Sequence, residues 1–170
     1  SNGSAYYLLT SLIDKGIVPS PRSGDATLIR RLYLDLHGLL PHPQTVKEYC
    51  EDKDPKKYSK LIEKLLGSSR YGERWARHWL DVARYADTKG YLAGGESRAY
   101  PYAYTYRDWV IKAFNKDLPY DEFIRKQMAA DSLTEQPNHP DLAALGFLTV
   151  GPVFLNRRQL IIDDQIDLVT

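Results

Sequence analysis

The sequence predicts an all-α fold, an irregular multi-helix single domain with one long loop rich in glycine and tyrosine. Apolar residues recur at the three- and four-residue spacing of helices, whereas the alternation typical of half-buried strands is nearly absent. Glycine and proline separate these segments, as they do at helix ends. We find no internal repeat and no low-complexity tract, which favours one domain.

The N-terminal part of the sequence divides into a helix and a connector. A helix is expected over residues 4–15, followed by a proline-rich stretch that ends at residue 24. We therefore assign residues 1–24 to an N-terminal helix and linker, with Ser1-Asn2 typical of a tag remnant. Residues 25–170 form the helical domain, and we expect the native chain to continue because its last helix has no glycine or proline stop signal.

The most clearly defined helix begins at Asp25, which we expect to cap it, and ends at Gly38. Between them lies a buried stripe formed by Leu28, Ile29, Leu32 and Leu36. The remaining helices are expected, in chain order, at residues 44–51, 54–66, 71–87, 104–114, 120–131 and 141–149, with a last one near the end of the chain.

The composition limits the classes of partner. The 170 residues include 23 basic and 22 acidic ones, for a formal net charge of +1. A chain so close to neutral lacks the positive field that nucleic-acid-binding proteins use, and we expect no nucleic-acid partner. No apolar run approaches the ~18 residues of a membrane span. The single cysteine, Cys50, excludes an internal disulfide but leaves the compartment open.

The densest group of chemically active residues lies on the expected helix at residues 71–87. Residues three or four positions apart are neighbours on a helix. This helix is therefore expected to carry an apolar stripe of Trp75, Trp79, Val82 and Ala86 beside a charged stripe of Glu73, Arg77, Asp81 and Arg84.

Two interpretations of this charged helix remain open. His78 stands three residues before Asp81, a spacing at which a carboxylate can orient an imidazole as a general base. We nominate His78, Asp81, Arg84 and Asp87 as catalytic residues, and Glu73 and Arg77 as ligand-binding residues. Alternatively, the charges form an ion-pair ladder that locks neighbouring helices, each exposed pair contributing ~0.3–0.5 kcal/mol. Their position among tryptophans suggests partial burial, where charges are costly unless paired or used.

Tyrosine and glycine are concentrated between residues 85 and 106. Tyrosine offers a flat apolar face and a hydroxyl group, which suits sugar stacking or a protein interface. We nominate Tyr91, Tyr100 and Tyr102 as ligand-binding residues and carbohydrate as a candidate partner. The alternative is that these tyrosines form the edge of the core. Asp87 and Glu96 flank the loop, but the regular spacing of a calcium loop is absent, and we predict no metal site.

Several motifs of common enzyme classes are absent from the sequence. These are the glycine-rich phosphate loop, the dinucleotide fingerprint, His-Glu-x-x-His and Gly-x-Ser-x-Gly. The haem-attachment motif Cys-x-x-Cys-His is absent too, and we expect this fragment to bind no cofactor.

Four segments carry a resemblance to a known family. They read RRLYLDLHGL (residues 30–39), RYGERWARHWLD (70–81), ARYADT (83–88) and YRDWVI (106–111). In these segments the chain resembles the planctomycete cytochrome domain 2 family, a domain of unknown function numbered 1549. The resemblance covers roughly residues 25–170 and includes the closing Asp164-Gln165-Ile166-Asp167.

The resemblance implies a context for the protein. Members of the family are typically large exported bacterial proteins in which a c-type cytochrome domain often precedes this one. It implies an exported, periplasmic or cell-surface location and a c-type haem domain as partner in the same chain. It also implies that a haem-attachment motif tends to lie shortly beyond the closing helix, which would give haem c to the full-length protein. It assigns no catalytic residues.

Three hypotheses follow from the sequence. The first is a non-haem helical part of an exported redox protein, which packs beside a c-type haem and contributes to redox chemistry or a substrate site. The second is a non-catalytic module that binds carbohydrate or a neighbouring domain. The third is a hydrolase that uses His78 and Asp81. Whether the chain is an enzyme stays open.

Overall fold

The computed structural model describes residues 3–89, 99–151 and 157–169. Within these ranges all the regular structure is helical, with no strand and one isolated bridge between Thr88 and Ala99. The all-α prediction is confirmed. In chain order the helices are α1 (Gly3–Asp14), α2 (Asp25–His37), α3 (Pro43–Glu51), α4 (Lys57–Leu66), α5 (Ser69–Val82), α6 (Ala103–Asn115), α7 (Tyr120–Leu133), the 3₁₀ helix η1 (Pro140–Leu148) and α8 (Arg158–Val169).

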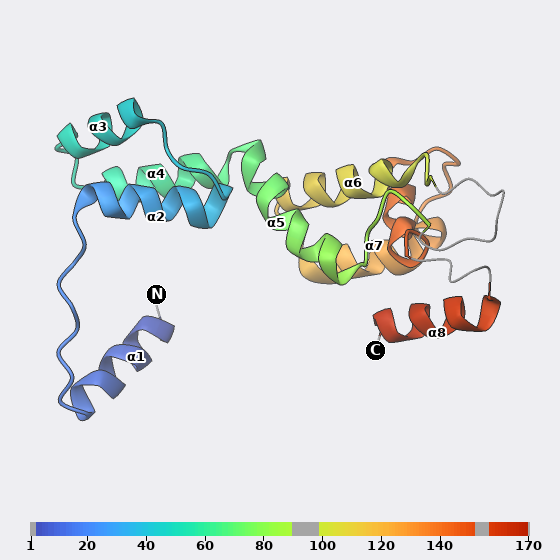
Figure 1. Cartoon of the computed structure of the whole chain (residues 1–170), viewed down its shortest axis with the longest axis horizontal. Helices are drawn as coiled ribbons and strands as arrows, with labels where there is room; N and C mark the ends of the chain where they lie inside the picture. The colour runs from blue at the N-terminus through green and yellow to red at the C-terminus, as the bar shows by residue number, and fades with distance from the viewer. Residues whose placement is uncertain (1–2, 90–98, 152–156, 170) are drawn as a thin grey trace.

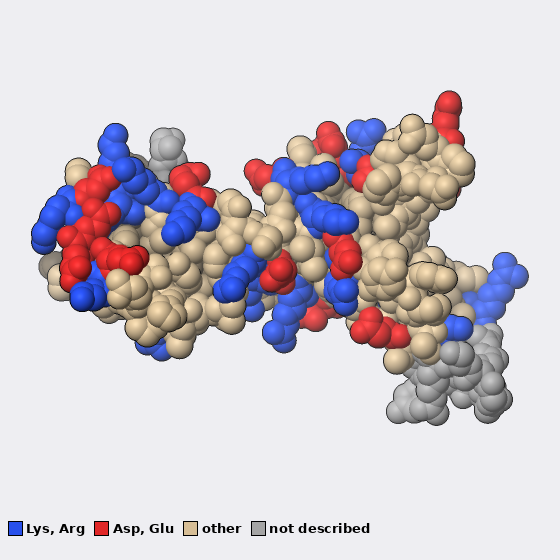
Figure 2. All heavy atoms as spheres, turned by 90° about the horizontal axis from the view of Figure 1, so that it is seen from above, with Lys and Arg blue, Asp and Glu red and all other residues tan. Residues whose placement is uncertain are grey.

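The helices form an elongated molecule with two lobes (Figure 1). The N-terminal lobe consists of α2, α3 and α4, and the C-terminal lobe of α5, α6, α7 and η1. Helix α5 contacts α2 and α4 as well as α6, and so joins the two lobes. Charged side chains crowd over the α2–α4 end, whereas much of the opposite end is uncharged in the view of Figure 2.

The core of the N-terminal lobe is small. It consists of Ile29, Tyr49, Leu61 and Leu65. Lys57 closes one end of it, because its Nζ donates to Asp25 Oδ2 at 2.6 Å and to the Tyr49 carbonyl oxygen at 2.9 Å. Asp25 is the first residue of α2 and pairs with Lys57, whereas Gly24 occupies the cap position that we expected Asp25 to fill.

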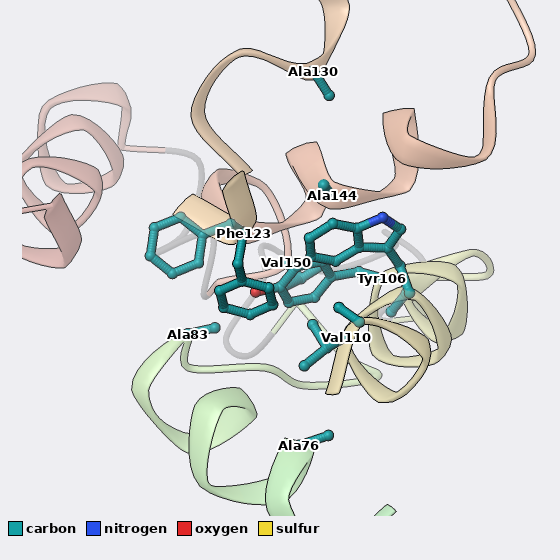
Figure 3. Close-up of a cluster of buried hydrophobic side chains, with 12 residues drawn as sticks. Ala76, Ala83, Tyr106, Val110, Phe123, Ala130, Ala144 and Val150 are labelled. Atoms are coloured by element: carbon teal, nitrogen blue, oxygen red, sulfur yellow. The ribbon is translucent and has the colours of Figure 1, made fainter. Parts of the chain in front are cut away.

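The core of the C-terminal lobe is larger and richer in aromatic rings. Phe123 stacks on Trp109 with 5.4 Å between ring centroids and meets Trp79 edge-on at 4.9 Å. Trp79 Nε1 and the Tyr106 hydroxyl both donate to Oε1 of the fully buried Gln127, at 2.8 and 2.7 Å. Figure 3 shows Phe123 and Tyr106 between Ala76 and Ala83 on one side and Ala130 and Ala144 on the other.

Helices α5 and α6 approach closely through small residues. A Cβ atom on Gly72 would lie 2.5 Å from the Ile111 carbonyl oxygen. Asn115 fixes the contact, since its Oδ1 accepts from the Gly72 N–H at 2.8 Å and its Nδ2 donates to the Ser69 carbonyl at 3.1 Å. Only glycine fits at position 72 without displacing backbone.

This contact sets the face that α5 buries. The buried residues are Gly72, Ala76 and Ala83, while Trp75 and Val82 are exposed. The expected apolar stripe is confirmed at Trp79, which packs against the core, and is wrong at Trp75 and Val82. Where α5 approaches α6 most closely only small side chains fit, and Trp75 and Val82 are left outside.

Helix α5 also ends earlier than the expected Asp87. Arg84 has a φ of 54°, in the left-handed region where a right-handed helix cannot continue. The N–H of Tyr85 then donates back to the Leu80 carbonyl at 2.9 Å, a helix end of the Schellman type.

The terminal helices lie at the margins of the molecule. Helix α1 lies apart from both lobes in Figure 1 and leaves Tyr6, Tyr7, Leu8 and Ile13 exposed. Helix α8 contacts the C-terminal lobe through Leu168, which packs against its core, and through polar side chains. Arg84 forms an ion pair with Asp164, and Gln165 Nε2 donates to the Leu148 carbonyl at 2.7 Å.

Candidate functional site

The face of α5 that carries the nominated residues points away from the core. Among them, Glu73, Arg77, His78, Asp81, Arg84 and Asp87 are all exposed. The expected partial burial is therefore wrong, because α5 buries its small residues against α6. The side chains of Glu73, Arg77, His78 and Asp81 remain accessible to a ligand or partner on this face.

The structure does not bring His78 and Asp81 together. The two residues share no hydrogen bond among the described residues, and the His78 ring packs against Trp75 with 5.5 Å between centroids. A general base needs a group that orients its imidazole. His78 has no such carboxylate within the part of the chain that the structure describes, so its catalytic role stays a prediction that this geometry does not support.

Arg84 and Asp87 have structural partners. Arg84 forms its ion pair with Asp164 of α8, in place of the expected pair with Asp81. Asp87 accepts a hydrogen bond from the Tyr85 hydroxyl at 2.7 Å. Burial and this hydrogen bond to Asp87 raise the pKa of Tyr85 to about 12, so the phenol keeps its proton at neutral pH.

The rest of the expected ladder is absent as well. Within the described residues, neither Glu73 nor Arg77 forms an ion pair, although they stand four residues apart on one helix. Both instead line a cavity of about 280 Å³ where the N-terminal half of α5 meets the end of α2. The cavity is also lined by His37, Gly38, Leu39, Arg70 and Arg74.

Three arginines dominate this arginine cavity. Arg70, Arg74 and Arg77 follow one another at helical spacing, and Glu73 is the only acidic residue among the described residues of the lining. None of the three guanidinium groups pairs with a carboxylate of the described chain. The cavity therefore carries a local excess of positive charge in a chain that is nearly neutral overall.

The glycine at the end of α2 determines where Arg74 lies. Gly38 has a φ of 69°, and a Cβ atom there would lie 2.7 Å from Cδ of Arg74, so the arginine stem packs directly on the glycine backbone. The Nε of Arg74 is shielded from solvent and has no acceptor among the described residues. A buried donor without an acceptor destabilises a protein by ~1–3 kcal/mol, and an anionic ligand would relieve that cost.

His37 contributes to the shape of the cavity more than to its chemistry. Its Nε2 lies 2.9 Å from the Leu65 carbonyl oxygen and must carry a proton to donate there. The buried ring thus ties the end of α2 to α4, beside the arginines.

The tyrosines nominated in the long loop differ in how far the structure buries them. Tyr100 is half-buried, donates to the Gly151 carbonyl at 2.9 Å, and burial raises its pKa. Tyr102 is 72% exposed and lies at a hollow of about 390 Å³. Tyr91 and Glu96 lie outside the described residues.

The structure also bears on metal sites and membrane spans. Among the described residues, no group of three or more histidine, cysteine, aspartate or glutamate side chains is placed to hold a metal ion. Within the same ranges, no helix has the length and apolarity needed to cross a membrane.

A family model described as PSCyt2, protein of unknown function (DUF1549), matches residues 6–169. The chain belongs to this family. The family name points to an association with planctomycete cytochromes, and it assigns no activity. No curated protein and no solved structure matches the chain.

In this PSCyt2 domain, sequence reasoning finds Glu73 and Arg77 of the arginine cavity but misses Arg70 and Arg74. Their spacing of four residues, continued to Arg77, is the signal that could have found them. The contribution of Gly38 and His37 has no such signal, because it depends on how α2 packs against α5.

Proposed function

We propose that this domain is a non-catalytic binding module of an exported, cytochrome-containing protein. In this proposal the arginine cavity binds an anionic group on the c-type haem domain of the same chain. The single observation that carries the proposal is the convergence on one cavity of three guanidinium groups that have no ion-pair partner among the described residues. The family name supplies the cytochrome context.

The chemistry of the cavity favours a carboxylate as the bound group. Guanidinium groups bind carboxylates through two parallel hydrogen bonds, and such charge-assisted bonds are stronger than neutral ones. Haem propionates and acidic surface side chains both offer carboxylates. Arg74 Nε adds a donor already shielded from water, where an ionic hydrogen bond is worth more than on the surface.

Binding is favoured over catalysis because the nominated catalytic groups lack partners of the right kind. His78 has no hydrogen bond to a carboxylate among the described residues. Arg84 already pairs with Asp164 of α8, and Asp87 already accepts a hydrogen bond from Tyr85. A general acid or base, by contrast, is held by neighbours that tune its pKa.

The first test is a visible absorption spectrum of the full-length protein produced with haem-maturation machinery. A Soret band supports the proposal, and its absence overturns the cytochrome context. The second test measures binding of the separately produced haem domain by calorimetry at low and moderate salt. Affinity should fall as salt rises, because the contact is ionic.

Matched variants locate the contact. Replacing Arg70, Arg74 and Arg77 together by glutamine should weaken binding at least about tenfold, or ~1.4 kcal/mol, and remove most of the salt dependence. Arg125→Gln, an exposed arginine of α7, is the control for removal of one positive charge. Equal affinity of the triple variant and the unmodified domain would overturn the assignment of the arginine cavity.

A carbohydrate-binding role is a second candidate, favoured by the exposed ring of Tyr102 at the edge of its hollow. An exposed aromatic ring beside an apolar hollow suits sugar stacking. On a glycan array, Tyr102→Ala should lose any signal that Tyr104→Ala retains, since Tyr104 lies outside that hollow. No signal from the unmodified domain would remove this candidate.

A further inference from the structure

A second cavity, in the C-terminal lobe, is lined by Tyr71 and Trp79 of the same helix α5 that carries the arginines. It has a volume of about 470 Å³ and is bounded by α5, the end of α6 and the start of α7. We call it the aromatic cavity, because its lining includes Tyr71, Trp79, Phe114, Tyr120 and Phe123. Its size falls within the range of about 300–1,000 Å³ typical of small-molecule sites.

The aromatic rings give the cavity an apolar lining. The polar edge of Trp79 is already used, since its N–H donates to Gln127 at 2.8 Å. Phe123 meets both Trp79 and Phe114 edge-on, with centroids 4.9 and 5.8 Å apart. The face of an aromatic ring attracts cations through its quadrupole.

Among the described residues, one charged side chain lines the aromatic cavity, and its backbone conformation is unusual. Asp117 has a φ of 49° at the end of α6. Its N–H donates to the Phe114 carbonyl and that of Leu118 to the Ala113 carbonyl, both at 3.1 Å, which places Asp117 at the position where helix ends favour glycine. Any residue with a Cβ atom is strained there, aspartate less than most.

No contact within the described chain explains this aspartate. Its carboxylate forms no hydrogen bond or ion pair among the described residues. Arg84, which occupies the equivalent left-handed position at the end of α5, uses its side chain to hold Asp164. Strained residues without a structural reason are found at functional sites.

We propose that the aromatic cavity binds a small organic cation, of the quaternary ammonium or methylated amine class, with the Asp117 carboxylate as its counter-ion. A cation with an apolar shell matches both the aromatic lining and the negative charge of Asp117. A sugar would need more hydrogen-bonding groups than this lining offers, and an anion would be repelled by Asp117. The inference does not depend on the proposed function, because it concerns a different cavity.

Choline and its neutral isostere 3,3-dimethylbutan-1-ol test the proposal. The two probes have the same shape and differ in charge, and tryptophan fluorescence or calorimetry can follow both. Choline should bind at least about tenfold more tightly than the alcohol. Equal binding of the two probes, or no binding of either, would overturn the proposal.

Variants at position 117 separate function from stability. Asp117→Asn should lose the preference for choline, because it keeps the shape and removes the charge. Asp117→Gly should lose it too, while the melting temperature rises by roughly 2–4 °C as the strain is relieved. An Asp117→Gly variant that binds choline as tightly as the unmodified domain would contradict the inference.

Tyr120 provides a second variant that leaves the fold intact, because its side chain is 71% exposed. Tyr120→Ala should weaken choline binding by removing one ring from the cavity. Tyr6→Ala, a comparably exposed tyrosine on α1, is the control and should leave the affinity unchanged. If the two variants behave alike, Tyr120 does not belong to a cation site.

Discussion

The N-terminal lobe closes a small apolar core with a charged side chain, whereas the C-terminal lobe fills a larger core with aromatic rings. In the first, Lys57 donates to Asp25 of α2 and to the backbone of α3. In the second, Phe123 contacts Trp79, Trp109 and Phe114. The stability of the C-terminal lobe therefore depends mainly on close packing of its side chains. The stability of the N-terminal lobe depends more on a few hydrogen bonds and ion pairs.

Among the variants that test this difference, Phe123→Ala is expected to lower the free energy of unfolding most. The ring is buried and touches three other aromatic rings, so its removal leaves a void that the rigid neighbours cannot fill. We expect a loss of ~3–5 kcal/mol in the free energy of unfolding, measured by urea denaturation. Tyr120→Ala on the same helix is the control and should cost much less.

The next effect tests the smaller core. Leu65→Ala should cost ~2–4 kcal/mol, because Leu65 is 2% exposed. Leu66→Ala is a matched control at the adjacent, 39% exposed position. Hydrogen exchange should show α2 and α4 losing protection before α6 and α7. Uniform loss of protection in both lobes would show that they unfold as one unit.

Substitution of a glycine tests the role of close approach. Gly72→Ala should cost ~1–3 kcal/mol, because the new Cβ would lie 2.5 Å from a backbone oxygen of α6. Gly67→Ala is the control, since its Cβ would meet its nearest neighbour at 3.4 Å. If the two variants melt at the same temperature, small residues are not what holds α5 against α6.

The smallest expected effect is on how the free energy of unfolding changes at acid pH. The hydrogen bond from Lys57 lowers the pKa of Asp25 below its ordinary value of 3.8. This pair therefore contributes stability above pH 3.8 that is lost as the pH falls through the lowered pKa. Unfolding free energies between about pH 5 and pH 2 should fall less steeply for Asp25→Asn than for the unmodified domain.

In the C-terminal lobe, Asp141 is the carboxyl group whose pKa is lowered, as that of Asp25 is in the N-terminal lobe. Burial alone would raise its pKa, but hydrogen bonds from Trp109 and Lys126 outweigh burial and lower it. Part of the acid sensitivity should therefore persist in Asp25→Asn. Identical slopes in the variant and the unmodified domain would show that the Lys57 pair does not contribute to acid sensitivity.

Most of the helices can be predicted from the sequence. Helix α2 runs from Asp25 to His37, as its apolar stripe and the following glycine predict. Other helices were placed to within a few residues, because each is bounded by proline, glycine or a polar cap. Periodicity and stop signals act locally, and local signals suffice to find helices.

The candidate sites are less predictable, because they depend on which face each helix buries. Two tryptophans suggest that α5 buries Trp75, but the short distance to α6 favours Ala76 instead. The aromatic cavity escapes sequence reasoning for another reason. It brings Tyr71 of α5 together with Asp117, which follows α6, and no local pattern connects them.

The ion pair between Arg84 and Asp164 has a consequence for the order of folding. It joins residues 80 positions apart, and closing so long a loop in an unfolded chain is entropically costly. Once α6, α7 and η1 have packed, α8 is tethered near its site and little of that cost remains. We therefore expect α8 to dock on the left-handed end of α5 only after the rest of the C-terminal lobe has formed.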